Sequence, residues 1–128
     1  MALWKVFCKS GPSDVYRALS TRLGRERFWA SSAEESDGVI AFALPDGRTD
    51  DSRIEQADPD RLYRVRHFGE TLTFVLTATA GGTELTLDST SDTAAEHVSL
   101  LLRLKASVDF GVDLRNHDEG RTAGYVDS

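Results

Sequence analysis

The 128-residue sequence has very little cysteine and no long apolar run, and each absence narrows what the chain can be. Its single cysteine, Cys8, cannot form an intrachain disulfide or a thiolate metal cage, so a reducing compartment is expected. No stretch approaches the ~20 apolar residues that cross a bilayer, and the first residues lack the apolar core of a signal peptide. We therefore expect a cytoplasmic protein without stable membrane insertion.

Basic residues are also in the minority. Fifteen Lys and Arg stand against 21 Asp and Glu, which gives a formal net charge of -6. A net negative charge disfavours binding to the phosphates of nucleic acids, so no nucleic-acid partner is expected. The N-terminal third is nevertheless basic, and Arg22, Arg25 and Arg27 are expected to be exposed there. This cluster is either a solvated surface or a docking site for an acidic protein partner.

What is present is the composition of a globular protein, with 40 % hydrophobic and 28 % charged residues. The chain is too short for a second independent core and long enough to fold without disulfides. We therefore expect one domain that spans residues 1–128.

Side-chain periodicity predicts a strand, two short helices, five further strands and a long last helix. The first strand is expected over 3–10, and Gly11-Pro12 separates it from a helix whose apolar positions extend to Leu23. A second helical piece is expected over 26–30, followed by a polar, turn-like segment over 31–37. The later strands are expected at 38–44, 52–57, 61–68, 71–79 and 83–90, and the last helix at 94–114.

Five strands in succession, without intervening helices, favour an antiparallel sheet. The last helix would be about 30 Å long and carries an apolar stripe, so it must lie across something broad and apolar. The expected fold is therefore α+β, a curved antiparallel six-stranded sheet that wraps a long C-terminal helix.

Three segments resemble a known family, namely 11–19, Phe28-Trp29-Ala30 with Ala33-Glu34-Glu35, and 38–42. They are similar to the START/Bet v 1-like (SRPBCC) superfamily, in the branch related to the C-terminal domain of the heat-shock-protein-90 ATPase activator. The resemblance covers nearly the whole chain and implies a helix-grip fold. Because that fold hosts lipid carriers, cyclases, hydroxylase domains and co-chaperone modules, it does not by itself select a function.

The tail adds to this resemblance. Residues 112–118, Arg121-Thr122 and 124–127 are similar to the end of small bacterial members of the family. Those members usually have a Trp where this chain has Ala123, which leaves the packing or partner role of the tail open.

A sheet that wraps a helix encloses a space that is either filled by side chains or left as an apolar cavity. Both alternatives stay open at the level of sequence. The leading hypothesis is a cavity that binds a small hydrophobic molecule, such as a lipid, an isoprenoid or an aromatic metabolite, without catalysis and without a cofactor. The expected ligand-binding residues are Trp29, Phe42, Tyr63, Val65, His67, Phe74, Leu76, Leu85, Leu87, Leu101, Leu104 and Val108.

The strand over 61–68 contains the most informative polar residues. Tyr63 and His67 share one face with Val65, whereas the opposite choice of face would bury two arginines at high cost. His67 is therefore the best candidate for a polar contact with a ligand. A core histidine without a ligand is the alternative.

Catalytic and metal-binding motifs are weak. Cys8 lies on the buried face of its strand, and no nucleophile elbow is present. Asp113 and His117 stand four residues apart, but no third and fourth ligands can be assigned, so no metal is expected. Two further hypotheses remain, a cyclase or dehydratase that uses His67 and Tyr63 as acid and base, and a protein-interaction module of the co-chaperone kind.

Overall fold

The computed structural model describes residues 2–91, 93–118 and 125–127. Its elements, in chain order, are β1 (Ala2–Cys8), α1 (Pro12–Ser20), α2 (Arg22–Glu26), β2 (Ser32–Ser36), β3 (Val39–Ala43), β4 (Thr49–Asp58), β5 (Leu62–His67), β6 (Glu70–Thr79), β7 (Gly82–Ser89) and α3 (Ala94–Phe110). The sheet order is β1-β7-β6-β5-β4-β3-β2, and every neighbouring pair is antiparallel.

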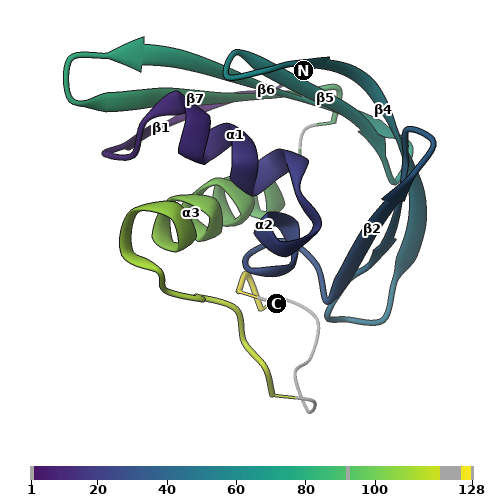
Figure 1. Cartoon of the computed structure of the whole chain (residues 1–128). Coiled ribbons are helices and arrows are strands. Elements are labelled where there is room, and N and C mark those ends of the chain that lie inside the picture. The colour runs from purple at the N-terminus through teal and green to yellow at the C-terminus, as the bar shows by residue number, and fades with distance from the viewer. Residues whose placement is uncertain (1, 92, 119–124, 128) are drawn as a thin grey trace.

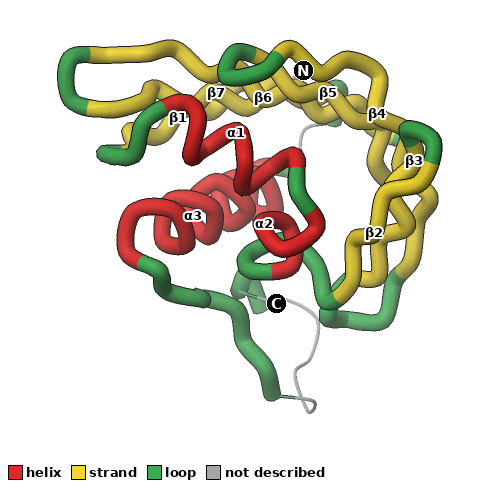
Figure 2. Tube along the Cα trace, in the orientation of Figure 1, coloured by secondary structure: helices red, strands yellow, loops and turns green. Residues whose placement is uncertain are grey.

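The sheet curves around the three helices, which lie together on its concave side (Figure 1). The strands form a bent wall and the helices occupy its interior (Figure 2). A register shift between Ile54 and Gln56 interrupts the pairing of β4 with β5, and such bulges bend a strand and increase its twist. The expected α+β fold, with a curved antiparallel sheet and a C-terminal helix, is confirmed.

The expected number of strands was wrong. Within the described residues the sheet has seven strands, because the segment predicted as a turn over 31–37 contains β2. Asp37 and Gly38 have φ values of 53° and 78° and connect β2 directly to β3. An Asp-Gly pair with two left-handed residues is the preferred two-residue hairpin turn, since its twist matches that of the strands.

The predicted bounds of the second helix and of the last helix were also wrong. The second helix is α2, four residues earlier than the expected piece over 26–30, and the Thr21 hydroxyl caps it by accepting from the Gly24 amide at 3.1 Å. The last helix ends at Phe110 rather than at 114, because Gly111 adopts a left-handed φ of 63° and closes the helix. Leu23, expected on the apolar face, is 68 % exposed.

Arg25 is not exposed, contrary to the expectation for the basic cluster. Its side chain is 1 % exposed, and its guanidinium donates to the carbonyl of Leu19 at 3.2 Å and twice to that of Ala33, at 2.9 and 3.3 Å. Burial lowers the pKa of this guanidinium, because removal from water disfavours the charged form. Arg25 therefore joins the end of α1 to β2 inside the molecule and is not part of a docking surface.

The choice of inward face on β5 is confirmed. Tyr63, Val65 and His67 are buried, while Arg66 on the opposite face is exposed. Within the described residues, no helix combines the length and the apolar character that crossing a bilayer requires.

The contact between α1 and α2 gives the first testable prediction. A Cβ atom at Gly24 would lie 2.6 Å from the carbonyl oxygen of Ala18, so Gly24→Ala forces the two helices apart. We expect a loss of about 1–3 kcal/mol in the free energy of unfolding, as for other overpacked sites, measured by urea denaturation. Gly81→Ala is the control, since its nearest neighbour would be the Phe7 ring at 3.7 Å. Equal stability of the two variants would contradict the close approach of the helices.

Candidate functional site

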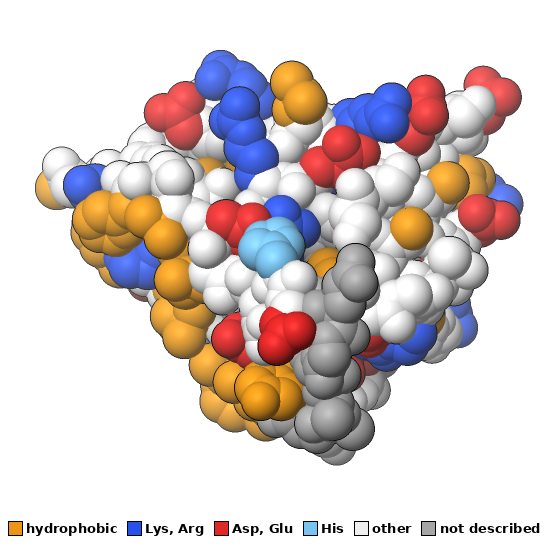
Figure 3. Space-filling model, turned by 90° about the horizontal axis from the view of Figure 1, so that it is seen from below, with side chains coloured by type: hydrophobic (Ala, Val, Ile, Leu, Met, Phe, Trp, Pro, Cys, Tyr) orange, Lys and Arg blue, Asp and Glu red, His pale blue; other side chains and the backbone are white. Residues whose placement is uncertain are grey.

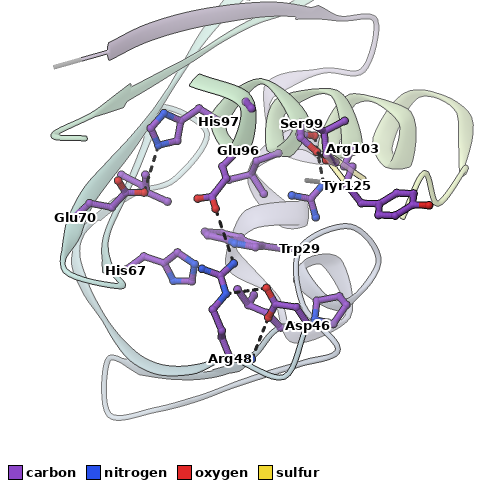
Figure 4. A pocket seen from close by; sticks show the side chains of 16 residues that line it. Trp29, Asp46, Arg48, His67, Glu70, Glu96, His97, Ser99, Arg103 and Tyr125 are labelled. Carbon is purple, nitrogen blue, oxygen red and sulfur yellow. Dashed lines mark hydrogen bonds and ion pairs between the residues drawn. The ribbon is translucent and has the colours of Figure 1, made fainter. Parts of the chain in front are cut away.

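A pocket of about 590 Å³ opens between the concave side of the sheet and the first half of α3. The turn after α2, the connection between β3 and β4, the strands β5 and β6, and two residues near the C-terminus complete its wall. Figure 4 shows how the labelled side chains surround it. The lining consists of Trp29, Leu44, Pro45, Asp46, Arg48, His67, Glu70, Leu72, Ala95, Glu96, His97, Ser99, Leu100, Arg103, Tyr125 and Val126.

Trp29 and His67 form the inner wall of this pocket and belong to an aromatic cluster that continues behind them. The Trp29 ring lies 4.8 Å from the Phe42 ring, 5.7 Å from Phe74 and 5.2 Å from His67, measured between centroids. Pairs at these distances, tilted or edge to face, are favourable because the positive edge of one ring meets the negative face of another. The aromatic cluster therefore fills the interior behind Trp29, and the open space lies in front of it.

His67 is buried where the cluster meets the pocket. Its Nδ1 lies 2.8 Å from the Ser52 hydroxyl oxygen, and its side chain is 6 % exposed. Burial lowers the pKa of His67 from 6.5 to about 4, although the carboxylates of Asp50 and Glu70 oppose the shift. The imidazole is therefore neutral at neutral pH.

A second histidine faces the pocket from α3. The Nε2 of His97 lies 3.3 Å from a carboxylate oxygen of Glu70, whose other oxygen accepts from the Ser89 hydroxyl at 3.3 Å. The Nδ1 of His97 is buried and has no hydrogen-bond partner among the described residues. Sequence reasoning placed His97 on the apolar stripe of the helix but did not select it as a binding residue.

Ion pairs border the mouth of the pocket. Arg48 lies 2.7 Å from Asp46 and 4.0 Å from Glu96, so it connects the segment between β3 and β4 with α3 (Figure 4). These side chains are about half exposed, and pairs of this kind contribute about 0–1 kcal/mol each. Their role is to define a polar rim rather than to stabilise the fold.

Two buried or half-buried arginines hold the turn that carries Trp29. Arg103 donates to the carbonyl of Phe28 at 3.0 Å, and burial lowers the pKa of Arg103 to about 10. Arg115, in the tail beyond α3, donates to the carbonyls of Glu26 and Ala30, both at 2.8 Å. Trp29 is therefore fixed by its backbone neighbours on both sides.

Of the twelve residues predicted to bind a ligand, Trp29 and His67 line the pocket. The other ten lie outside its lining, and they are Phe42, Tyr63, Val65, Phe74, Leu76, Leu85, Leu87, Leu101 and Leu104, all buried, and Val108, packed against the same core. That a ligand reaches these ten residues stays a prediction. The polar part of the lining, with Arg48, Glu70, Glu96 and Arg103, was missed, because no local pattern indicates that these separate segments meet.

The remaining candidates do not converge on a metal site. His117 and Asp113 lie 2.8 Å apart in the tail beyond α3, and Asp113 also pairs with Arg115 at 2.9 Å. Within the ranges that the structure describes, no group of three or more His, Cys, Asp or Glu side chains has an arrangement that could hold a metal ion.

No protein-family model matches the chain, and no curated protein matches it. Solved structures do. SSP2350 of Staphylococcus saprophyticus matches with a TM-score of 0.77 at 20 % identity, over 88 % of this chain and 94 % of that one. The Aha1 dimer of Colwellia psychrerythraea matches with a TM-score of 0.73 at 20 % identity, over 87 % and 98 %. DynU16, from the dynemicin biosynthetic locus, matches with a TM-score of 0.74 at 17 % identity, over 91 % and 49 %.

At sequence identities of 17 to 20 %, similarity to these solved structures shows the fold alone. The chain has the helix-grip fold, and the family resemblance of its sequence segments is confirmed at that level. Part of the tail motif, Arg121-Thr122 with Ala123 and Gly124, lies outside the described residues. Since one fold hosts many functions, the function has to be argued from the pocket.

The low pKa of His67 predicts a specific dependence of stability on pH. The unfolded chain binds a proton at this residue with a pKa near 6.5, whereas the folded chain does so at about 4. Stability is therefore lost as the pH falls from about 6.5 to about 4, by up to about 3 kcal/mol.

His67→Phe removes this contribution, so its stability should fall less steeply than that of the wild type over the same pH window. Chemical denaturation at pH 7, 5.5 and 4.5 measures the difference, and an NMR titration of the wild type gives the pKa directly. If the free energy of unfolding falls equally with pH in the two proteins, the pKa of His67 is not lowered by folding and the prediction is wrong.

Proposed function

We propose that the pocket beside Trp29 and His67 binds a small, largely apolar molecule, and that it does so without catalysis. The observation that supports this most directly is the pocket itself. Its volume of about 590 Å³ falls in the range of roughly 300–1,000 Å³ that is typical of small-molecule sites. Its wall combines apolar side chains, such as Trp29, Leu72 and Leu100, with a few buried polar groups that can orient a ligand.

The size of the pocket sets the expected affinity. A ligand that buries roughly 250 Å² of apolar surface gains about 6 kcal/mol at ~25 cal/mol per Å². Part of this gain offsets the entropy lost on association, so unoptimised ligands should bind with micromolar to millimolar dissociation constants. Such affinities are accessible to NMR titration.

The enzymatic alternative has less support in the geometry. Tyr63, the second member of the suggested acid-base pair, does not line the pocket, and burial raises its pKa to about 12. A histidine with a pKa of about 4 is also a weak base at neutral pH. A cyclase or dehydratase based on this pair would need both groups at one reacting centre.

The binding proposal predicts the effect of filling the pocket. In a ¹H–¹⁵N NMR titration with 2-naphthol, we expect saturable shifts at amides of residues that line the pocket. Leu100→Trp and Ala95→Trp should weaken binding at least about tenfold, because the new ring occupies the ligand's space. The matched control is Leu102→Trp, on the same helix but 46 % exposed and outside the lining, which should change the affinity less than about twofold.

A result in which 2-naphthol shifts the same amides equally in all four proteins would place its binding elsewhere. Ala95 is exposed, so the folding of Ala95→Trp does not depend on core packing. That variant therefore keeps the experiment decisive if Leu100→Trp is too unstable to study.

A protein-interaction module is the second candidate, favoured by the similarity to the Aha1 dimer and by the exposed Arg22 and Arg27. Arg22 already pairs with Glu26 at 2.9 Å and with Glu34 at 3.5 Å, so its charge is partly compensated. On the described part of the face in Figure 3, Lys and Arg are interspersed with Asp and Glu.

The double variant Arg22→Glu/Arg27→Glu tests this second candidate. It should abolish salt-sensitive capture of an acidic partner, while Arg17→Glu, at the exposed pair with Asp14, should leave capture unchanged. Co-purification at low and high salt is the measurement. Unaltered capture by the double variant would leave the arginines as a solvated surface only.

A further inference from the structure

Behind His67, three side chains form a continuous chain of hydrogen bonds. The Ser52 hydroxyl oxygen lies 2.7 Å from a carboxylate oxygen of Asp50 and 2.8 Å from Nδ1 of His67. Asp50 and Ser52 are two residues apart on β4, so their side chains point to the same face of the sheet. Ser52 is fully buried, so the middle of this chain of bonds is shielded from water.

The positions of the protons follow from what each group can donate. A carboxylate accepts only, and the same Asp50 oxygen also accepts the Phe68 amide at 3.0 Å. The single Ser52 hydroxyl proton therefore points to Asp50. The Ser52 oxygen is then the acceptor for His67, so Nδ1 carries the imidazole proton and Nε2 carries a lone pair.

The other ring nitrogen of His67, Nε2, takes no part in this chain of hydrogen bonds. Among the described residues it has no hydrogen-bond partner, yet His67 is 6 % exposed and lines the pocket. Nε2 is not one of the buried, unpartnered polar atoms of the described residues, so it is reachable from the pocket, where a ligand that donates a hydrogen bond can bind to it.

The surrounding rings keep the imidazole in this orientation. Phe42, Trp29 and Phe68 lie 4.5, 5.2 and 4.7 Å from its centroid, all edge to face. Phe68 is held at a left-handed φ of 49°, which is uncommon for a bulky residue, and its amide is bound by Asp50. Asp50 therefore holds both the hydroxyl that orients His67 and the turn that places a ring against it.

The arrangement differs from a catalytic triad. In a triad the acid orients the histidine and the histidine takes the serine proton. Here the serine stands in the middle and donates a hydrogen bond to the acid, while its oxygen accepts from the histidine, so no base is placed to take the serine proton. Ser52 and Asp50 are positioning residues, and His67 is the group that meets the ligand.

The charges of the lining indicate the kind of ligand that fits. Three carboxylates, Asp46, Glu70 and Glu96, face two arginines, Arg48 and Arg103. Both arginines already have partners, Arg48 with two of the carboxylates and Arg103 with backbone carbonyls. An anionic head group would be repelled by the lone pair of His67 and by this surplus of negative charge, whereas a neutral hydroxyl group can donate to the lone pair without that repulsion.

We propose that the Asp50–Ser52–His67 relay presents Nε2 of His67 as a hydrogen-bond acceptor, and that the pocket therefore takes a small neutral molecule whose hydroxyl group, on an aromatic or alicyclic body, donates to it. This proposal rests on the proposed binding function and adds the chemistry of the ligand's polar group. The hydroxyl points to the relay, and the apolar body lies against Trp29, Leu72 and Leu100.

The relay also fixes the expected pH dependence. The charged groups that face His67 are Asp50 from β4, Glu70 from β6 and Arg48 from the segment before β4. Protonation would convert Nε2 into a donor, and burial opposes it until the pH reaches about 4. Affinity for a hydroxyl ligand should therefore be constant between pH 8 and about 5.5 and fall below that range.

The first experiment reads the tautomer in the unliganded full chain. Histidine ¹⁵N spectra at pH 7 distinguish the two neutral forms and the cation, and His67→Phe assigns the signal among the three histidines. We expect the Nδ1-protonated form in the wild type and a mixture of tautomers in Ser52→Ala. A predominantly Nε2-protonated or charged His67 in the wild type overturns the proposal without reference to any ligand.

The second experiment compares three probes of similar shape, 2-naphthol, 2-methylnaphthalene and 2-naphthoate. In the wild type, 2-naphthol should bind roughly tenfold more tightly than 2-methylnaphthalene, which is the effect of one hydrogen bond. The carboxylate 2-naphthoate should bind more weakly than 2-naphthol. His67→Phe should bind 2-naphthol and 2-methylnaphthalene equally, and Ser52→Ala should lose most of the preference.

The outcomes separate this inference from the binding proposal. If 2-naphthol and 2-methylnaphthalene bind the wild type equally and Ala95→Trp blocks both, the pocket binds apolar molecules and the relay has no role in recognition. If the carboxylate binds best, the arginines select the ligand and the relay proposal is wrong. If none of the three probes binds at millimolar concentration, the binding function fails, and the inference fails with it.

Discussion

The exclusion of water from the core between the sheet and the helices is the constraint on which this structure depends. A polar group that turns inward there must find a partner within the protein or raise the free energy of the folded state. Arg25 satisfies this condition with two backbone carbonyls, and Ser52 does so with Asp50 and His67. These two residues therefore form short local networks, whereas the Tyr63 hydroxyl and Nδ1 of His97 are buried without a partner among the described residues.

The aromatic cluster divides the interior into two parts with different properties. On one side, side chains of β5, β6, β7 and α3 pack into a mainly apolar core that also contains Tyr63. On the other side, Trp29 and His67 border a pocket with a polar rim. Trp29 stands at the boundary, because it lines the pocket and its ring also contacts the buried rings of Phe42 and Phe74.

The parts of the fold that could be predicted from the sequence follow from local periodicity. The cost of burying Arg64 and Arg66 was sufficient to orient β5, and the antiparallel sheet followed from the succession of strands. β2 was missed because polar residues dominate it, although the Asp37-Gly38 turn was a readable signal. The pocket rim was beyond prediction, since Arg48 and Glu96 meet only in the folded chain. The same holds for the chain of bonds through Ser52, whose members lie on different strands.

The hydrogen bonds from Arg103 and Arg115 to the segment that carries Trp29 all go to main-chain atoms, namely the carbonyls of Glu26, Phe28 and Ala30. Carbonyl groups are common to all twenty amino acids, so this anchoring is indifferent to which side chains the segment displays. The side chains of residues 28–30 are buried in the core, so a substitution there keeps these hydrogen bonds but still has to fit the surrounding packing. Trp29 is the member of this segment that lines the pocket, so it is the position at which a substitution of fitting shape would alter the cavity without loss of the main-chain anchors.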